Sequence, residues 1–159
     1  MNWNKTAKNN DIVKRIKGIL KSHSFTKKLM ADYKIPVEDI DNNLEIIIEE
    51  LDGKFAEGNG KKIFLDKKLF EKDFFKENFH FLIHEFFHWI KRRCEKDFYF
   101  NDPEELQSFT LAICWELLNN KDIDKTIYPI IKSHFKDEFQ SRKVFNKMVE
   151  RAKDIIENL

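Results

Sequence analysis

Five consecutive residues carry the clearest chemistry in this chain: His84-Glu85-Phe86-Phe87-His88, an H-E-x-x-H pattern. On a helix, residues four apart lie about 40° apart around the axis and about 6 Å apart along it, so both imidazoles can reach one metal ion. Zinc held in this way lowers the pKa of a bound water toward about 7. Glu85 is turned about 100° from His84, where it can accept a proton from that water without being a ligand. The pattern predicts a zinc site with Glu85 as general base.

The H-E-x-x-H pattern leaves the third ligand open, because a catalytic zinc usually has three protein ligands and a water. One known extension, H-E-x-x-H-x-x-G-x-x-H, does not fit, since position 91 is lysine and position 94 is cysteine. Without the glycine the helix has no reason to turn, so Cys94 would lie about two turns beyond His88, out of reach of the metal. We therefore interpret Cys94 as a partly buried thiol.

A glutamate from the next predicted helix is the better source of the third ligand. Glu104 and Glu105 begin that helix, and the loop before them lets the two helices run antiparallel. We favour Glu105, because it shares a helical face with the apolar Phe109. Glu104 is the second choice; it shares its face with Ser108, which can hold a carboxylate or a ligand histidine by a hydrogen bond. A carboxylate in the first turn of a helix also interacts favourably with the helix dipole, so either glutamate has a purely structural explanation as well.

Four further polar residues are candidates for a supporting role near the metal. His80 lies one turn before His84, and we interpret it as a partly exposed histidine at the start of the helix rather than as a catalytic group. Tyr99 follows the active-site helix, and Tyr128 and His134 lie further along the chain. Each of these three can donate a hydrogen bond to an oxyanion, and the sequence does not choose between them.

Helices account for most of the expected fold. Apolar residues recur at spacings of three and four, and the chain has only 4 Gly and 3 Pro. Ser24 and Asp102 are the expected N-caps, with Pro103 at the first helical position and Glu105 completing a capping box. The expected helices lie at about residues 11–22, 24–33, 72–95, 103–118, 123–135 and 136–158, with a turn or short helical piece at 39–43.

Three short apolar strands are expected before the active-site helix, at residues 44–50, 54–56 and 61–65. The turn signals between them, Asp52-Gly53 and Glu57–Gly60, predict a small antiparallel sheet with the helices packed on it, an α+β domain. We expect one domain, divided into a helical part at 1–43, the sheet and active-site helices at 44–120, and C-terminal helices at 121–159.

Composition narrows the classes of function. The 159 residues carry a net charge of +1 from 29 basic and 28 acidic residues, which argues against direct nucleic-acid binding or a polybasic membrane binder. No apolar run approaches the roughly 18 residues of a membrane span, and residues 1–10 lack a signal-peptide core. Cys94 and Cys114 make no disulfide framework, which fits a reducing compartment. We expect a cytoplasmic protein that binds no membrane.

The pattern at 84–88, the strands before it and the acidic start of the next helix resemble zincin metallopeptidases of the gluzincin type. The order of elements over about residues 44–118 resembles the small ImmA/IrrE-like and phage-type metallopeptidases, with the stretch from Glu105 to Ala112 matching their glutamate-bearing helix loosely. The resemblance implies that the strand before the active-site helix, here 61–65, forms the rim of the cleft and pairs with an extended substrate. It also implies a sheet above the metal and helices below it.

Two functions from different classes follow. The first is a zinc metallopeptidase that hydrolyses a peptide bond of a peptide or protein substrate, with His84, His88 and Glu105 (or Glu104) as ligands and Glu85 as base. The alternative is a non-catalytic, zinc-stabilised interaction module that binds a protein partner. The resemblance also suggests a regulatory protease that cleaves a repressor of a mobile element. Because the sequence shows no DNA-binding segment, that function would require a separate partner.

Overall fold

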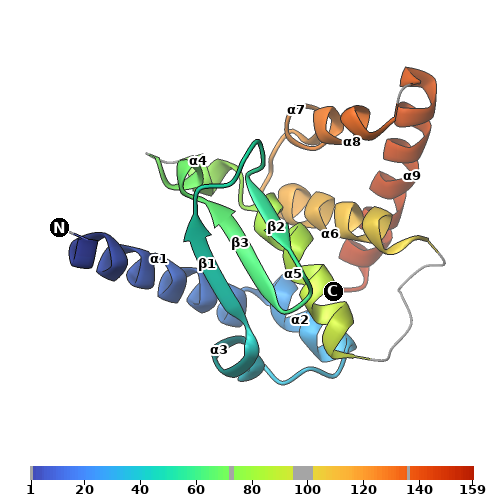
Figure 1. Ribbon diagram of the computed structural model, residues 1–159. Coiled ribbons are helices and arrows are strands. Elements are labelled where there is room, and N and C mark those ends of the chain that lie inside the picture. Colours follow the sequence, from blue (N-terminus) through green and yellow to red (C-terminus); the bar gives the residue numbers. More distant parts are fainter. Residues whose placement is uncertain (1, 72–73, 95–101, 136) are drawn as a thin grey trace.

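The computed structural model describes residues 2–71, 74–94, 102–135 and 137–159, and it has a mainly helical α+β architecture with a small sheet (Figure 1). Its elements are α1 (Asn2–Ser22), α2 (Ser24–Asp32), α3 (Asp39–Asn43), β1 (Glu45–Glu49), β2 (Ala56–Gly58), β3 (Lys62–Asp66), the 3-10 helix η1 (Lys67–Phe70), α4 (Phe74–Glu77), α5 (His80–Arg93), α6 (Glu104–Leu118), α7 (Ile123–Thr126), α8 (Tyr128–His134) and α9 (Glu138–Glu157). Within the described ranges, no helix combines the length and the apolar character needed to cross a membrane.

The sheet is mixed, so the prediction of an antiparallel meander is wrong. The strand order is β1-β3-β2, with β1 parallel to β3 and β2 antiparallel to it. Ile63 and Leu65 on β3 are fully buried, so the most buried strand lies in the centre. β2 is therefore an edge strand, and the expectation that residues 61–65 form the rim of the cleft is also wrong.

Asp66, the last residue of β3, explains how the chain crosses from β1 to the far edge of the sheet. Its buried carboxylate accepts the backbone N–H groups of Leu51 at 2.8 Å and of Lys68 at 2.7 Å. Its own N–H donates to the carbonyl of Phe55 at 2.8 Å. These bonds hold the segment 51–55 over the end of β3, so Asp52-Gly53 turns the chain past β3 instead of forming a tight hairpin.

α5 is the central helix, lying between the sheet and α6 (Figure 1). Most of its apolar residues are fully buried, and a buried side chain of this size contributes about 1.5–3 kcal/mol. They are Leu82, Ile83, Phe86, Phe87, Trp89 and Ile90. The packing of these apolar residues fixes the position of α5 and therefore of the polar residues that lie among them in the sequence.

Two of the predicted helices are divided in the structure. The helix expected at 72–95 is split into α4 and α5 at Asn78-Phe79, where hydrogen bonds span three residues instead of four and Phe79 turns inward to stack on Trp115. The helix expected at 123–135 is split into α7 and α8, because Pro129 lacks an N–H and starts a new helix.

The predicted helix caps also differ from the observed ones. His23, not Ser24, caps α2, with its Nδ1 accepting the N–H of Phe25 at 3.2 Å. Pro103 occupies the N-cap position of α6 and makes no side-chain cap bond. The side chain of Asp102 instead pairs with Lys147 of α9 at 3.0 Å and lies 3.4 Å from Arg151. That ion pair ties the start of α6 to α9.

Candidate metal centre

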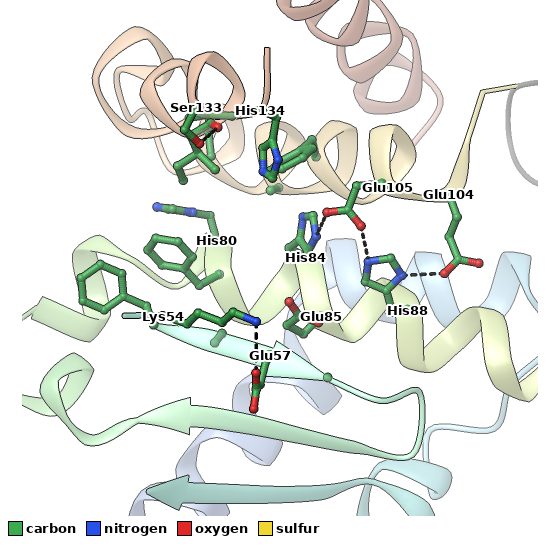
Figure 2. Close-up of a pocket in the computed structure, with 18 of the residues that line it drawn as sticks. Lys54, Glu57, His80, His84, Glu85, His88, Glu104, Glu105, Ser133 and His134 are labelled. Atoms are coloured by element: carbon green, nitrogen blue, oxygen red, sulfur yellow. Dashed lines mark hydrogen bonds and ion pairs between the residues drawn. The ribbon is translucent and has the colours of Figure 1, made fainter. Parts of the chain in front are cut away.

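His84, His88 and Glu105 form a group that could hold a metal ion, since one ligand atom of each lies within 4.8 Å of the others. Glu105 Oε1 lies 2.9 Å from His84 Nε2, and Glu105 Oε2 lies 3.1 Å from His88 Nε2 (Figure 2). Both imidazoles therefore turn the same nitrogen toward one carboxylate. Two imidazole nitrogens and a carboxylate oxygen are a donor set that zinc takes in catalytic sites. The residues fit the predicted metal by their chemistry.

α5 and α6 position this group. His84 and His88 lie one helical turn apart on α5, and their rings meet edge to face with centroids 5.1 Å apart. Glu105 lies in the first turn of α6, and Phe109 one turn further packs on His84 at 4.5 Å. The side chain of His84 is 12% exposed and that of Glu105 54% exposed. The group is thus held from behind by packed helices and open to solvent on the Glu105 side.

Glu104 has a different place from Glu105. Its Oε2 lies 2.6 Å from His88 Nδ1, the ring nitrogen turned away from Glu105. A histidine that binds a metal through one nitrogen commonly donates its other N–H to a carboxylate, which fixes the tautomer and the ring orientation. Ser108 Oγ lies 3.2 Å from His88 Nε2 and donates to the Glu104 carbonyl at 3.1 Å. The geometry places Glu105 among the ligands and Glu104 behind His88; whether each acts so stays a prediction.

The pKa values in the group follow from these contacts. Burial alone would lower the pKa of His88, but hydrogen bonds with Glu105 and Glu104 raise it to about 9. Hydrogen bonds from His84 and then His88 hold the pKa of Glu105 well below its usual range. Metal ligation requires neutral imidazoles, so a bound ion would take the place of the proton that His88 otherwise keeps at neutral pH.

Glu85 lies on the side of α5 that faces β2, away from Glu105 (Figure 2). A Cβ added to Gly58 of β2 would stand 2.8 Å from Glu85 Oε2. Burial raises the pKa of the Glu85 carboxyl. The structure thus places a carboxylate next to the histidine pair but outside the ligand group, which is the arrangement a general base needs. Its catalytic role stays a prediction.

A cleft of about 970 Å³ is lined by the metal group, Glu85 and Glu104. Segment 53–60, which includes β2, lines one side, and Ile127, Pro129, Ile130, Ser133 and His134 line the other, with α5 and α6 between them. This size is within the range of ligand sites, about 300–1,000 Å³. The cleft places an edge strand beside the metal group, but the strand is β2 and not residues 61–65.

β2 and α5 run in the same direction along the cleft, which three contacts show. The rings of Phe55 and Phe81 lie 5.2 Å apart. Gly58 lies against Glu85, and Gly60 lies against the side chain of Arg92. The contacts advance together along both elements, so Phe55 and Phe81 lie at one end of the cleft and Arg92 lies at the other. From the sequence, these two glycines are only part of the turn predicted at Glu57–Gly60, and the Gly-Asn-Gly pattern one strand before the H-E-x-x-H helix is the signal that points to the site.

The supporting residues occupy different places. His80 is 2% exposed and lines the cleft, so the expectation of a partly exposed histidine is wrong. Burial and then the charge of His84 lower the pKa of His80 to about 4, so the ring is neutral at pH 7. In the described part of the chain, His80 Nε2 and His84 Nδ1 are buried without a hydrogen-bond partner.

The three oxyanion candidates are separated by the structure. His134 lines the cleft, with Phe109 packed between it and His84. Tyr128 is buried against Phe145 and Arg142 and is not among the cleft residues. Tyr99 lies outside the described residues. Cys94 ends α5 as a free thiol and does not belong to the metal group found among the described residues.

In comparisons with known proteins, no family model, no curated protein and no solved structure matches the chain.

Proposed function

We propose that this chain is a zinc-dependent metallopeptidase that hydrolyses a peptide bond. The observation that supports the proposal best is the convergence of His84 Nε2, His88 Nε2 and the Glu105 carboxylate within 4.8 Å, with the separate Glu85 carboxylate on the same helix. Three protein ligands leave room for a water, as catalytic zinc sites do, whereas structural sites are usually closed by four. The open side of the group, toward solvent and the cleft, fits that difference.

Each residue of the site has a task in this proposal. When bound, zinc polarises the substrate carbonyl and makes a water more acidic. Glu85 accepts the proton of the attacking water and later delivers it to the nitrogen of the leaving amine. Burial raises the pKa of Glu85 toward neutral pH, which suits a group that must first accept a proton and then donate it. Glu104 holds the Nδ1 side of His88, so the ring keeps the orientation that ligation requires.

β2 is the substrate-binding edge in this proposal. One side of β2 is hydrogen-bonded to β3, and among the described residues no strand pairs with its other edge, which lies beside the cleft. An extended peptide can add to such an edge as a further strand. Gly58, the last residue of β2, keeps this end of the edge free of a side chain, where the peptide must approach Glu85. The cleft residues between Ile127 and His134 then cover the peptide from the opposite side.

Zinc content and hydrolysis together test the proposal. Purified protein should hold one zinc ion per chain and cleave peptides from a random library, and a chelator should abolish cleavage until zinc is restored. His84→Ala should lose both zinc and cleavage. A protein that binds zinc tightly but cleaves no peptide or protein would instead support the non-catalytic interaction module, and a protein that binds no zinc would contradict both functions.

A further inference from the structure

Four residues of α5 line the cleft at a spacing of four: His80, His84, His88 and Arg92. Successive members lie about 6 Å apart along the helix axis. Along α5 the cleft therefore presents first the neutral, buried imidazole of His80, then the metal group, and last the guanidinium of Arg92. Any extended substrate that lies along the cleft meets these groups in that order.

Gly60 provides the place that the Arg92 side chain occupies. Gly60 has φ +83, a conformation that favours glycine, and a Cβ there would collide with Arg92 Cγ and lie 3.0 Å from its Cδ and Nε. Asn59 closes the turn, with its Oδ1 accepting the N–H groups of Lys61 at 2.9 Å and Lys62 at 2.8 Å. The Arg92 stem thus lies over the backbone just beyond the end of β2.

The neighbouring Arg93, in contrast, has a structural role, because its guanidinium is paired within the protein. Its Nε and Nη2 donate to Asp39 at 3.1 and 2.9 Å, and its guanidinium lies over the Trp89 ring. Arg92 has no hydrogen bond or ion pair within the described ranges of the chain, although Glu104 also lines the cleft. The nearby carboxylates are engaged elsewhere, Glu104 by His88 and Glu105 by both histidines.

An unpaired guanidinium in a cleft is suited to a carboxylate, which it can bind through two parallel N–H donors. Gly58 lies beside Glu85, and Gly60, in the turn after β2, lies beside Arg92. Arg92 follows Glu85 by seven residues, about 10 Å along the α5 axis, and an extended peptide rises about 3.3 Å per residue, so a group two to three residues from the bond at Glu85 reaches the level of Arg92. At the opposite end, Phe55 and Phe81 pack together, and the nearby ammonium of Lys54 is already paired with Glu57 at 3.4 Å.

We propose that Arg92 determines specificity by binding a substrate carboxylate two to three residues from the scissile bond. The carboxylate belongs to an Asp or Glu side chain or to the C-terminus of the peptide. The proposal rests on the proposed peptidase function, and it adds that the preferred substrates are acidic on one side of the cleaved bond. Arg92 positions the substrate and takes no part in the proton transfers.

Random decapeptide pools with zinc-loaded protein test this, one pool with free C-terminal carboxylates and one with C-terminal amides. Mass spectrometry of the products shows which residues flank each cleaved bond. We expect Asp and Glu to be enriched two to three residues from the bond in both pools if a side chain is bound. Preference for the free-acid pool, with cleavage two to three residues from its end, would instead identify the C-terminal carboxylate.

Matched variants then assign the preference to Arg92. For the best peptide, replacing its acidic residue by the amide, or its C-terminal acid by the amide, should lower kcat/KM about tenfold in the natural protein, mainly through KM. In Arg92→Ala that ratio should fall to about one, and Arg92→Lys should keep part of it, because the charge remains without the planar fork. Arg93→Ala, whose guanidinium pairs with Asp39, should keep the full ratio.

The outcomes separate the two proposals. Cleavage with no acidic preference, or a preference that Arg92→Ala retains, would overturn the role of Arg92 and leave the peptidase function standing. No cleavage in either pool by protein shown to contain zinc would overturn both. Zinc content measured in every variant should be unchanged, since Arg92 does not contact the metal group, and a loss of zinc in Arg92→Ala would also contradict the inference.

Discussion

The carboxylate of Glu85 lies against the backbone of Gly58, so close that a Cβ at Gly58 would stand 2.8 Å from Glu85 Oε2. The catalytic base of the proposed reaction is therefore positioned in part by the absence of a side chain on the edge strand. Because the atom in the way is the end of a flexible side chain, a larger residue at position 58 would displace the carboxylate and leave the fold intact.

Gly58→Ala should consequently lower peptide hydrolysis by about 10- to 100-fold while zinc content and the thermal unfolding midpoint stay nearly unchanged. A misplacement of a reacting group by about 1 Å costs up to about 10²-fold in rate. Gly18→Ala in α1 is the matched control, since a Cβ at Gly18 meets nothing within 4 Å. Hydrolysis by Gly58→Ala at the rate of Gly18→Ala would show that this contact does not position the base.

Glu104 and Glu105 should affect zinc binding to different degrees. Glu105→Gln removes a ligand and should nearly abolish tight binding. Glu104→Gln removes the negative charge behind His88 and should weaken binding about 10- to 100-fold, the usual effect of losing such an outer carboxylate. Competition with a chromophoric chelator measures both affinities. A larger loss in Glu104→Gln than in Glu105→Gln would mean that Glu104 is the ligand.

His80 should make the fold sensitive to mild acid. Burial, followed by the charge of His84, lowers the pKa of His80 to about 4, whereas the unfolded chain has the ordinary value of 6.5. Since the unfolded chain binds the proton more readily, the contribution of His80 is complete above pH 6.5 and is lost as pH falls toward 4. The loss should be roughly 3 kcal/mol of unfolding free energy.

The difference between natural protein and His80→Phe isolates this effect, measured by urea unfolding in a chelator between pH 4 and 7.5. The raised pKa of His88 acts in the opposite sense, with stability lost as pH rises through about 9, and is common to both proteins. The natural protein should lose stability relative to His80→Phe as pH falls through this range. A pH-independent difference would show that His80 is not a buried neutral imidazole.

Asp66 should contribute far more to the free energy of unfolding than an exposed aspartate does. Its buried carboxylate accepts the N–H groups of Leu51 and Lys68, which Asp66→Ala would leave without that acceptor. The expected cost is roughly 2–4 kcal/mol of unfolding free energy. Asp41→Ala is the control; it removes an exposed ion pair with Lys21 and should cost less than about 1 kcal/mol. Equal costs in urea unfolding would contradict the role of Asp66 in the crossing from β1 to β2.

The features that could be predicted from the sequence are the local ones. The spacing of His84 and His88 lies within one helix, and the helix was recognisable from its own apolar residues. The order of the strands depends on contacts between distant parts of the chain. β3 takes the central position because the segment 51–55 is bonded to Asp66, and the turn signal at Asp52-Gly53 fits a hairpin equally well.

The same distinction applies to the site. The acidic start of α6 was visible in the sequence, and the two adjacent glutamates could be ranked by the faces they share. The burial of His80 and the contacts of Gly58 and Gly60 could not be predicted, because they depend on the position of β2 along α5. Arg92 and Arg93 look alike in the sequence, whereas in the structure Arg93 pairs with Asp39 and Arg92 lines the cleft.

Glu85→Gln tests the central claim most directly, because it keeps the size of the side chain and removes its ability to accept a proton. Zinc content and peptide hydrolysis are measured on the natural protein and the variant side by side. The account predicts one zinc ion per chain in both, with hydrolysis slower in Glu85→Gln by about 10²–10⁴-fold, the contribution of a general base. Hydrolysis at the natural rate by zinc-loaded Glu85→Gln would contradict it.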